Sequence, residues 1–104
     1  DAWSWELYAN DFLTRHFSSS KITVAGKNVA GFDIPFLPKD ISARFRHKVL
    51  DPGPLFVNWD ADEQVPSFDL CKKRAGIDSP VAHDAREDAM DVICCLRKFY
   101  GGAV

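Results

Sequence analysis

The 104-residue sequence lacks any apolar run long enough to cross a membrane, and its first residues show no signal-peptide pattern. It also lacks an excess of basic residues, because 13 Lys and Arg stand against 15 Asp and Glu. No global positive field therefore marks the chain as a nucleic-acid binder, although metal ions can supply positive charge at an acidic site. The hydrophobic content of 46% is ordinary for a globular domain without membrane attachment.

Cysteine is scarce as well. The three cysteines, of which Cys94 and Cys95 are adjacent, are too few and too unevenly spaced for a disulfide framework. No Cys-x-x-Cys pair or Cys/His spacing indicates a zinc site. We expect small buried hydrophobic side chains in a reducing compartment, and therefore a cytoplasmic protein.

Apolar periodicity predicts an α/β layered domain that spans the whole chain, residues 1–104. The strands are short, β-branched and apolar, whereas the helices show apolar residues at helical spacing with capping residues at their ends. The expected helices cover residues 5–17, 67–75 and 84–99, with a further short helix that starts near residue 33. The expected strands cover 22–25 and 48–51, with a possible short strand at 55–57.

Asp88 is the strongest single indication of a functional site. It falls at the margin of the apolar stripe of the last helix, beside Val92 and Phe99, while Asp84 and Asp91 are expected to face solvent. A carboxylate at a core boundary is costly unless it is paired, hydrogen-bonded or bound to a metal. The alternative to a site is a salt bridge to a nearby cation, for which the candidates are Lys72, Lys73, Arg74 and Arg86.

Three further residues are candidates for the same chemistry. Asp33 follows a predicted strand and starts a helix, where sites of open α/β sheets gather, although it could simply cap that helix. Asn28 suits either a site or a tight turn. His83 precedes the last helix and could act as a general base, although a loop histidine is more commonly a surface residue.

Two ordered motifs combine these residues, Asn28-x-x-x-Phe32-Asp33 and His83-x-Ala-x-x-Asp88-Ala. They resemble the second and third motifs of the DEDDh 3′–5′ exonucleases, the family of polymerase proofreading subunits, RNase T and oligoribonuclease. The resemblance implies a ribonuclease H-like three-layer fold, of which this chain would be the C-terminal portion. It also implies that Asp33 and Asp88 are metal ligands, that His83 is the general base, and that Asn28 and Phe32 lie near the substrate.

In that family, two Mg²⁺ or Mn²⁺ ions hold the terminal phosphate at the 3′ end of single-stranded DNA or RNA, and the histidine activates the attacking water. The family's first motif, Asp-x-Glu, and its opening antiparallel strands have no counterpart here. Asp60-Ala61-Asp62 lies between the other two motifs and is interpreted as a solvated acidic turn. We therefore expect a piece of a longer protein that is inactive or weakly active alone, because half of the metal-binding carboxylates are missing.

The missing strands also predict that the segment 22–25 lies at an unpaired sheet edge. We expect this edge to be covered by a second copy of the chain, through self-association, or by rearranged local elements such as the segment 55–57. Two other hypotheses remain open. The chain could be a catalytically degenerate relative that binds nucleic acid or protein without hydrolysis. It could also be a small α/β interaction module whose motifs match by chance.

Overall fold

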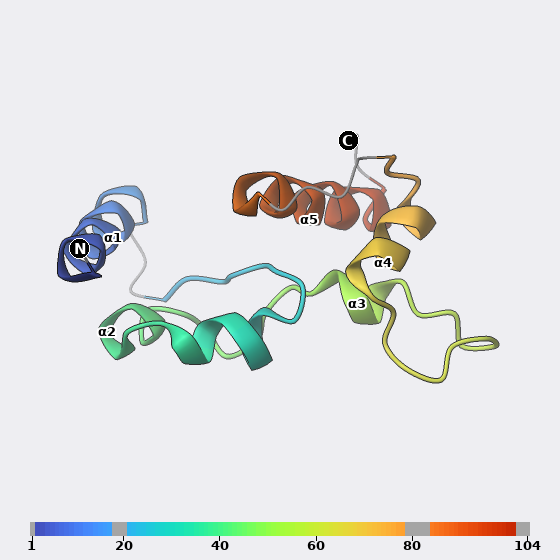
Figure 1. Cartoon of the computed structure of the whole chain (residues 1–104), viewed down its shortest axis with the longest axis horizontal. Helices are drawn as coiled ribbons and strands as arrows, with labels where there is room; N and C mark the ends of the chain where they lie inside the picture. Colours follow the sequence, from blue (N-terminus) through green and yellow to red (C-terminus); the bar gives the residue numbers. More distant parts are fainter. Residues whose placement is uncertain (1, 18–20, 79–83, 102–104) are drawn as a thin grey trace. The chain divides into compact units, whose positions relative to one another are not determined.

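A computed structural model describes residues 2–17, 21–78 and 84–101 of the chain, and its architecture is helical (Figure 1). The residues divide into two compact units, which we describe separately. Unit 1 comprises Asp1–Val24 and Val29–Val49, and unit 2 comprises Ala25–Asn28 and Leu50–Val104. The helices are α1 (Ala2–His16), the π-helical turn η1 (Val29–Asp33), the 3₁₀ turn η2 (Ile34–Phe36), α2 (Lys39–Ser42), α3 (Pro52–Leu55), α4 (Phe68–Ala75) and α5 (Ala85–Phe99).

The predicted α/β ribonuclease H-like fold is wrong for the residues that the structure describes, because they contain no strand and no sheet. The expected strand at 22–25 makes only two isolated parallel bridges, Ile22 with Phe45 and Ala25 with Leu50. The partner of Ile22 lies 23 positions along the chain and that of Ala25 lies 25 positions along, so the register shifts and no continuous ladder forms. The sheet edge on which self-association was predicted is therefore absent.

The other two predicted strands are also wrong. Of the segment 48–51, only Leu50 makes a bridge, and Gly26 donates its backbone N–H to the Leu50 carbonyl at 2.9 Å. The segment 55–57 contains the last residue of α3 followed by a turn at Phe56. The Asp51 carboxylate accepts a hydrogen bond from the Gly53 N–H at 2.9 Å, and Pro52 occupies the first helical position. This capping favours a helical turn over a strand.

Unit 1 contains α1, η1, η2 and α2, with α1 against α2 and η1 against η2. Among its described residues, Ile22 and Ile41 are buried, whereas η1 and η2 bury none. The parallel bridge at Ile22 is made by two hydrogen bonds, from the Ile22 N–H to the Arg44 carbonyl at 2.7 Å and from the Arg46 N–H to the Ile22 carbonyl at 2.8 Å. These bonds tie the segment that follows α2 to the segment that follows α1.

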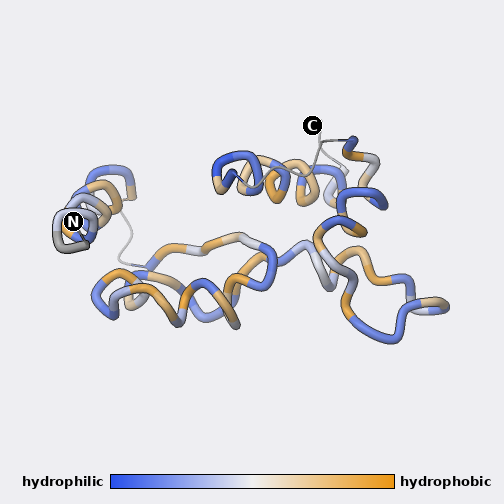
Figure 2. The backbone as a smooth tube through the Cα atoms, viewed as in Figure 1, coloured by the Kyte–Doolittle hydropathy of each residue, from blue (hydrophilic) through white to orange (hydrophobic). Residues whose placement is uncertain are grey.

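Unit 2 packs α3, α4 and α5 around two cysteines (Figure 1). Cys71 and Cys95 are completely buried, Ala75 is buried beside them, and Phe56 and Phe68 pack against the cluster. Hydrophobic and hydrophilic residues alternate along α5, as Figure 2 shows, so one face of this helix joins the core. All three cysteines are free thiols.

The predicted ends of α4 and α5 are confirmed where the structure describes them. The Ser67 hydroxyl accepts a hydrogen bond from the Leu70 N–H at 3.3 Å, and Gly76 ends α4 in the left-handed region with φ of 77°. The Asp84 carboxylate accepts from the Arg86 N–H at 2.9 Å and caps α5. The first helix is also confirmed, whereas its expected end at Ser18–Ser20 lies outside the described residues. None of the described helices is long and apolar enough to span a bilayer.

Candidate functional site

Asp33 lies at the junction of two helical turns in unit 1. It is the last residue of η1 and occupies the N-cap position of η2, but its side chain makes no capping hydrogen bond. The predicted short helix near Asp33 is therefore present, whereas the simple capping role is not. The Asp33 carboxylate is exposed and has no hydrogen bond or ion pair with another described residue. It is thus available to a ligand.

Asp88 lies in the first turn of α5 in unit 2 and is partly buried. Four other carboxylates among the described residues are partly buried, and each has a partner: Glu6, Asp51, Asp62 and Asp91. Asp88 alone of this group has no hydrogen bond or ion pair with a described residue. Partial burial of a carboxylate without a partner costs free energy, so Asp88 stays a candidate ligand-binding residue.

The salt bridge considered as the alternative for Asp88 belongs to Asp91 instead. The Lys72 ammonium lies 3.4 Å from the Asp91 carboxylate, and the two side chains are 6% and 13% exposed. The prediction that Asp91 faces solvent is therefore wrong. Lys72 also lies over the Phe68 ring, with 5.2 Å between Nζ and the ring centroid. Asp91, and not Asp88, is therefore the carboxylate of α5 that pairs with Lys72 of α4.

Asn28 and Phe32 differ in the way they fit a substrate site. Asn28 adopts a left-handed backbone with φ of 54°, and its N–H donates to the Asp51 carboxylate at 2.7 Å, which supports the turn role considered for it. Phe32 is 63% exposed, and its ring centroid lies 5.8 Å from that of Phe36, which is 79% exposed. This exposed pair of rings beside Asp33 could stack on bases.

The predicted acidic turn at Asp60–Asp62 is only partly solvated. Asp60 is exposed, but Asp62 is hydrogen-bonded to both terminal nitrogens of Arg74, with 2.9 Å between Nη2 and Oδ1. These hydrogen bonds, helped by the Asn58 N–H, lower the pKa of Asp62 from 3.8 to about 2. Asp62 is therefore an ionised structural group and does not replace the missing Asp-x-Glu.

His83 lies outside the described residues, so its role as a base stays a prediction. Asp33 belongs to unit 1 and Asp88 to unit 2, and each is described within its own unit. Their joint binding of a metal likewise stays a prediction. The described residues contain no group of three or more metal-binding side chains.

The Asp33 and Asp88 carboxylates are suitable ligands for Mg²⁺ or Mn²⁺ in chemical type but not in number. Carboxylate oxygens are the ligands that Mg²⁺ and Mn²⁺ prefer, and both candidate carboxylates lack protein partners in the described part of the chain. Two carboxylates can contribute to holding one ion, but they supply fewer ligands than a pair of ions requires.

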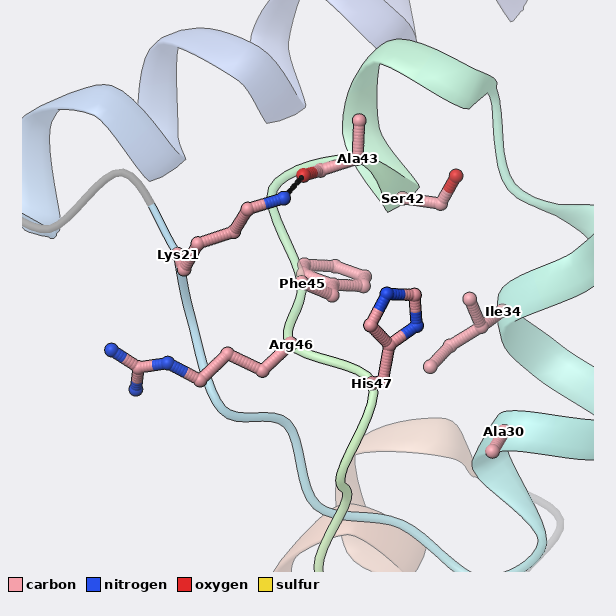
Figure 3. Close-up of a pocket in the computed structure, with 8 residues that line it drawn as sticks. All are labelled: Lys21, Ala30, Ile34, Ser42, Ala43, Phe45, Arg46 and His47. Atoms are coloured by element: carbon pink, nitrogen blue, oxygen red, sulfur yellow. Dashed lines mark hydrogen bonds between the residues drawn. The ribbon is translucent and has the colours of Figure 1, made fainter.

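Unit 1 contains a pocket with basic residues in its lining, which was not predicted from the sequence. The pocket has a volume of about 340 Å³ and is lined by the basic residues Lys21, Arg46 and His47 together with Ala30, Ile34, Ser42, Ala43 and Phe45 (Figure 3). The sequence does contain a signal for this basic pocket. The segment from Ile41 to Leu50 has two arginines, a lysine and a histidine but no acidic residue.

Comparison with known proteins returns no matching family, no matching curated protein and no matching solved structure. The exonuclease resemblance is carried by the residues of the two motifs.

Proposed function

We propose that the chain acts on single-stranded DNA or RNA 3′ ends as a metal-dependent 3′–5′ exonuclease module whose turnover is weak or absent on its own. The ordered pair of motifs carries this proposal. Support comes from Asp88, because it is the one partly buried carboxylate in the described residues that has no partner. An unpaired carboxylate at this motif position is expected of a metal ligand.

Each motif residue has a chemical task in this proposal. Asp33 and Asp88 supply oxygen ligands for Mg²⁺ or Mn²⁺, and such an ion, when bound, neutralises charge on the scissile phosphate. The His83 imidazole takes a proton from the attacking water. Phe32, with Phe36 beside it, stacks on a base near the 3′ end. Asn28 forms the turn that precedes η1 and so helps to position Phe32 and Asp33.

Asp88→Asn is the variant that tests this function, with Glu87→Gln as its matched control. Both acids lie in the first turn of α5, but Glu87 is exposed and is not part of the motif. With a 5′-labelled single strand and Mn²⁺, we expect slow release of 5′-mononucleotides, loss of release with Asp88→Asn and retention with Glu87→Gln. Full activity in EDTA, or an unchanged rate with Asp88→Asn, would contradict the mechanism.

A second candidate is a module that binds nucleic acid or protein without hydrolysis. The absence of Asp-x-Glu from the sequence favours it, since two carboxylates do not hold two ions. Binding of the single strand without any nucleotide release in Mn²⁺ would select this candidate over the exonuclease.

We further propose a cytoplasmic location. The three cysteines are free, and Cys71 and Cys95 are buried as small apolar side chains. Free buried thiols are typical of proteins in a reducing compartment. Fractionation of cells that express the complete protein would test this location.

A further inference from the structure

Five basic side chains of unit 1 belong to the segments that the Ile22–Phe45 bridge joins. We call them the basic face: Lys21, Arg44, Arg46, His47 and Lys48. Four of the five are exposed, and Arg44 is partly buried. No acid occurs in the segment from Ile41 to Leu50 that supplies four of them.

The arginines of the basic face are held by neutral oxygens. Arg44 donates from Nε to the Asn10 side-chain oxygen at 3.1 Å and from Nη2 to the Thr14 hydroxyl at 2.9 Å. Arg46 donates from Nη1 to the Thr23 hydroxyl at 3.1 Å. Neither arginine is ion-paired with another described residue.

A neutral acceptor fixes the position of a guanidinium without cancelling its charge. Asp40 accepts a hydrogen bond from the Asn10 amide at 2.8 Å, so Asn10 links the Asp40 carboxylate to Arg44 through its side chain. A guanidinium carries five N–H donors, and Arg46 uses one of them on Thr23. A guanidinium that is fixed in position and has unused N–H donors is well suited to bind a phosphate group.

The pocket connects this charge to the turns that carry the motif Asn28-x-x-x-Phe32-Asp33. Figure 3 shows the His47 ring beside Phe45 and Ile34, and the Lys21 ammonium bonded to the Ala43 carbonyl, at 2.8 Å. One wall is formed by Ala30 and Ile34, which belong to η1 and η2. The same two turns carry Asp33 and the exposed rings of Phe32 and Phe36.

We propose that the basic face binds the phosphate backbone of single-stranded nucleic acid and guides the strand towards the turns that carry Asp33. This inference rests on the proposed function for the identity of the ligand. Lys and Arg contacts to phosphates supply sequence-independent affinity, and exposed aromatic rings beside them stack on bases. Unit 1 has both features, so this binding does not require a metal ion.

Fluorescence anisotropy of a labelled single strand in EDTA tests the basic face apart from hydrolysis. The test variant is Arg46→Gln with Lys48→Gln, and the control is Arg97→Gln with Lys98→Gln, two exposed cations at the end of α5 in unit 2. Both double variants change the net charge equally. We expect the test variant to weaken binding about tenfold and to lower the salt slope of log K by about 1.4, because two phosphate contacts are lost.

The control should bind within about twofold of the original chain. Equal weakening in both double variants would overturn the inference, since it would show a general effect of charge. Absence of any strand binding in EDTA would overturn it as well. Competition by inorganic phosphate that is as strong as competition by an unlabelled strand would identify a pocket for a free phosphate and contradict the backbone assignment.

The exonuclease proposal can fail independently. Binding through the basic face without Mn²⁺-dependent nucleotide release refutes hydrolysis and leaves the basic face intact. Nucleotide release that is unaffected by Arg46→Gln with Lys48→Gln, together with unchanged binding, refutes the basic face and leaves the exonuclease intact.

Discussion

Lys72 and Arg74 of unit 2 and Arg44 and Arg46 of unit 1 have different kinds of partner. In unit 2, Lys72 is paired with Asp91 and Arg74 with Asp62, and all four side chains are less than a third exposed. In unit 1, Arg44 and Arg46 are held by amide and hydroxyl oxygens. Paired charge joins secondary-structure elements, whereas positioned unpaired charge remains available to an anion. The difference is consistent with a stabilising role for Lys72 and Arg74 and with the binding role that we propose for Arg44 and Arg46.

The two units differ in net charge but not in the exposure of their apolar residues. Unit 2 buries Cys71 and Cys95 completely, and the described part of unit 1 buries Ile22 and Ile41. Large apolar side chains are exposed in both units, with Phe36 at 79% in unit 1 and Trp59 at 89% in unit 2. Unit 1 has six Lys and Arg against five Asp and Glu, whereas unit 2 has seven against ten.

The largest contrast that we predict is in cysteine reactivity within unit 2. Burial raises the pKa of the Cys95 thiol to about 11 and also raises that of Cys71. At pH 8, about a thousandth of a thiol with such a pKa is ionised, and access is blocked as well. We expect Cys94, which is partly exposed, to react with iodoacetamide at least about a hundredfold faster than Cys95, as followed by peptide mass spectrometry. Equal rates would show that the cysteine core is open.

Removal of the Lys72 charge should destabilise the chain strongly. Lys72→Met keeps the aliphatic contact with Phe68 but leaves Asp91 without its ammonium, at an expected cost of about 1–3 kcal/mol in the free energy of unfolding by urea. The matched change in unit 1, Arg46→Gln, should cost less than about 0.5 kcal/mol, since its side chain is exposed. Equal losses of unfolding free energy in the two variants would show that Lys72 and Arg46 do not differ in their contribution to stability.

Loss of a helix cap should have an intermediate effect. Ser67→Ala removes the acceptor for the Leu70 N–H and should lower the free energy of unfolding by about 1 kcal/mol. The control is Ser42→Ala, because Ser42 ends α2 and caps no helix N-terminus. A neutral effect of Ser67→Ala in urea denaturation would show that the start of α4 is held by packing alone.

The smallest predicted effect is on the stability of the fold at acidic pH. Because Arg74 lowers the pKa of Asp62 from 3.8 to about 2 in the folded chain, ionised Asp62 stabilises the fold above about pH 4. This contribution is lost as the pH falls from about 4 through 2. Asp62→Asn should abolish that part of the pH dependence of thermal unfolding, whereas Asp60→Asn, at an exposed neighbour, should leave it unchanged. Identical acid profiles for the two variants would contradict the ion pair.

The helices could be predicted where local chemistry defines their ends. Ser67, Gly76 and Asp84 act on backbone groups within a few residues, and the structure has α4 and α5 at those positions. The absence of strands could not be predicted in this way. Ile22 and Ala25 pair with residues 23 and 25 positions along the chain, and local sequence does not define the register of such distant partners.

The site was predictable to the same limited extent. The position of Asp88 in the first turn of α5 follows from helical spacing. The choice of Asp91 as the partner of Lys72 did not follow, because it depends on how α4 packs against α5. Asp62 was misjudged for a similar reason, since its partner Arg74 lies on a different element. Non-local pairs of this kind decide which acids remain available to a metal ion.

The proposed function assigns Asp33 and Asp88 as ligands of a divalent ion. Amide NMR signals broadened by a low concentration of Mn²⁺ test it most directly, because paramagnetic broadening reports proximity to the ion. We predict that the signals of 32–34 and 86–90 broaden together, and that Asp88→Asn abolishes the broadening at both segments while Glu87→Gln preserves it. Broadening at only one segment, or stronger broadening at the acidic loop 60–63, would contradict the claim.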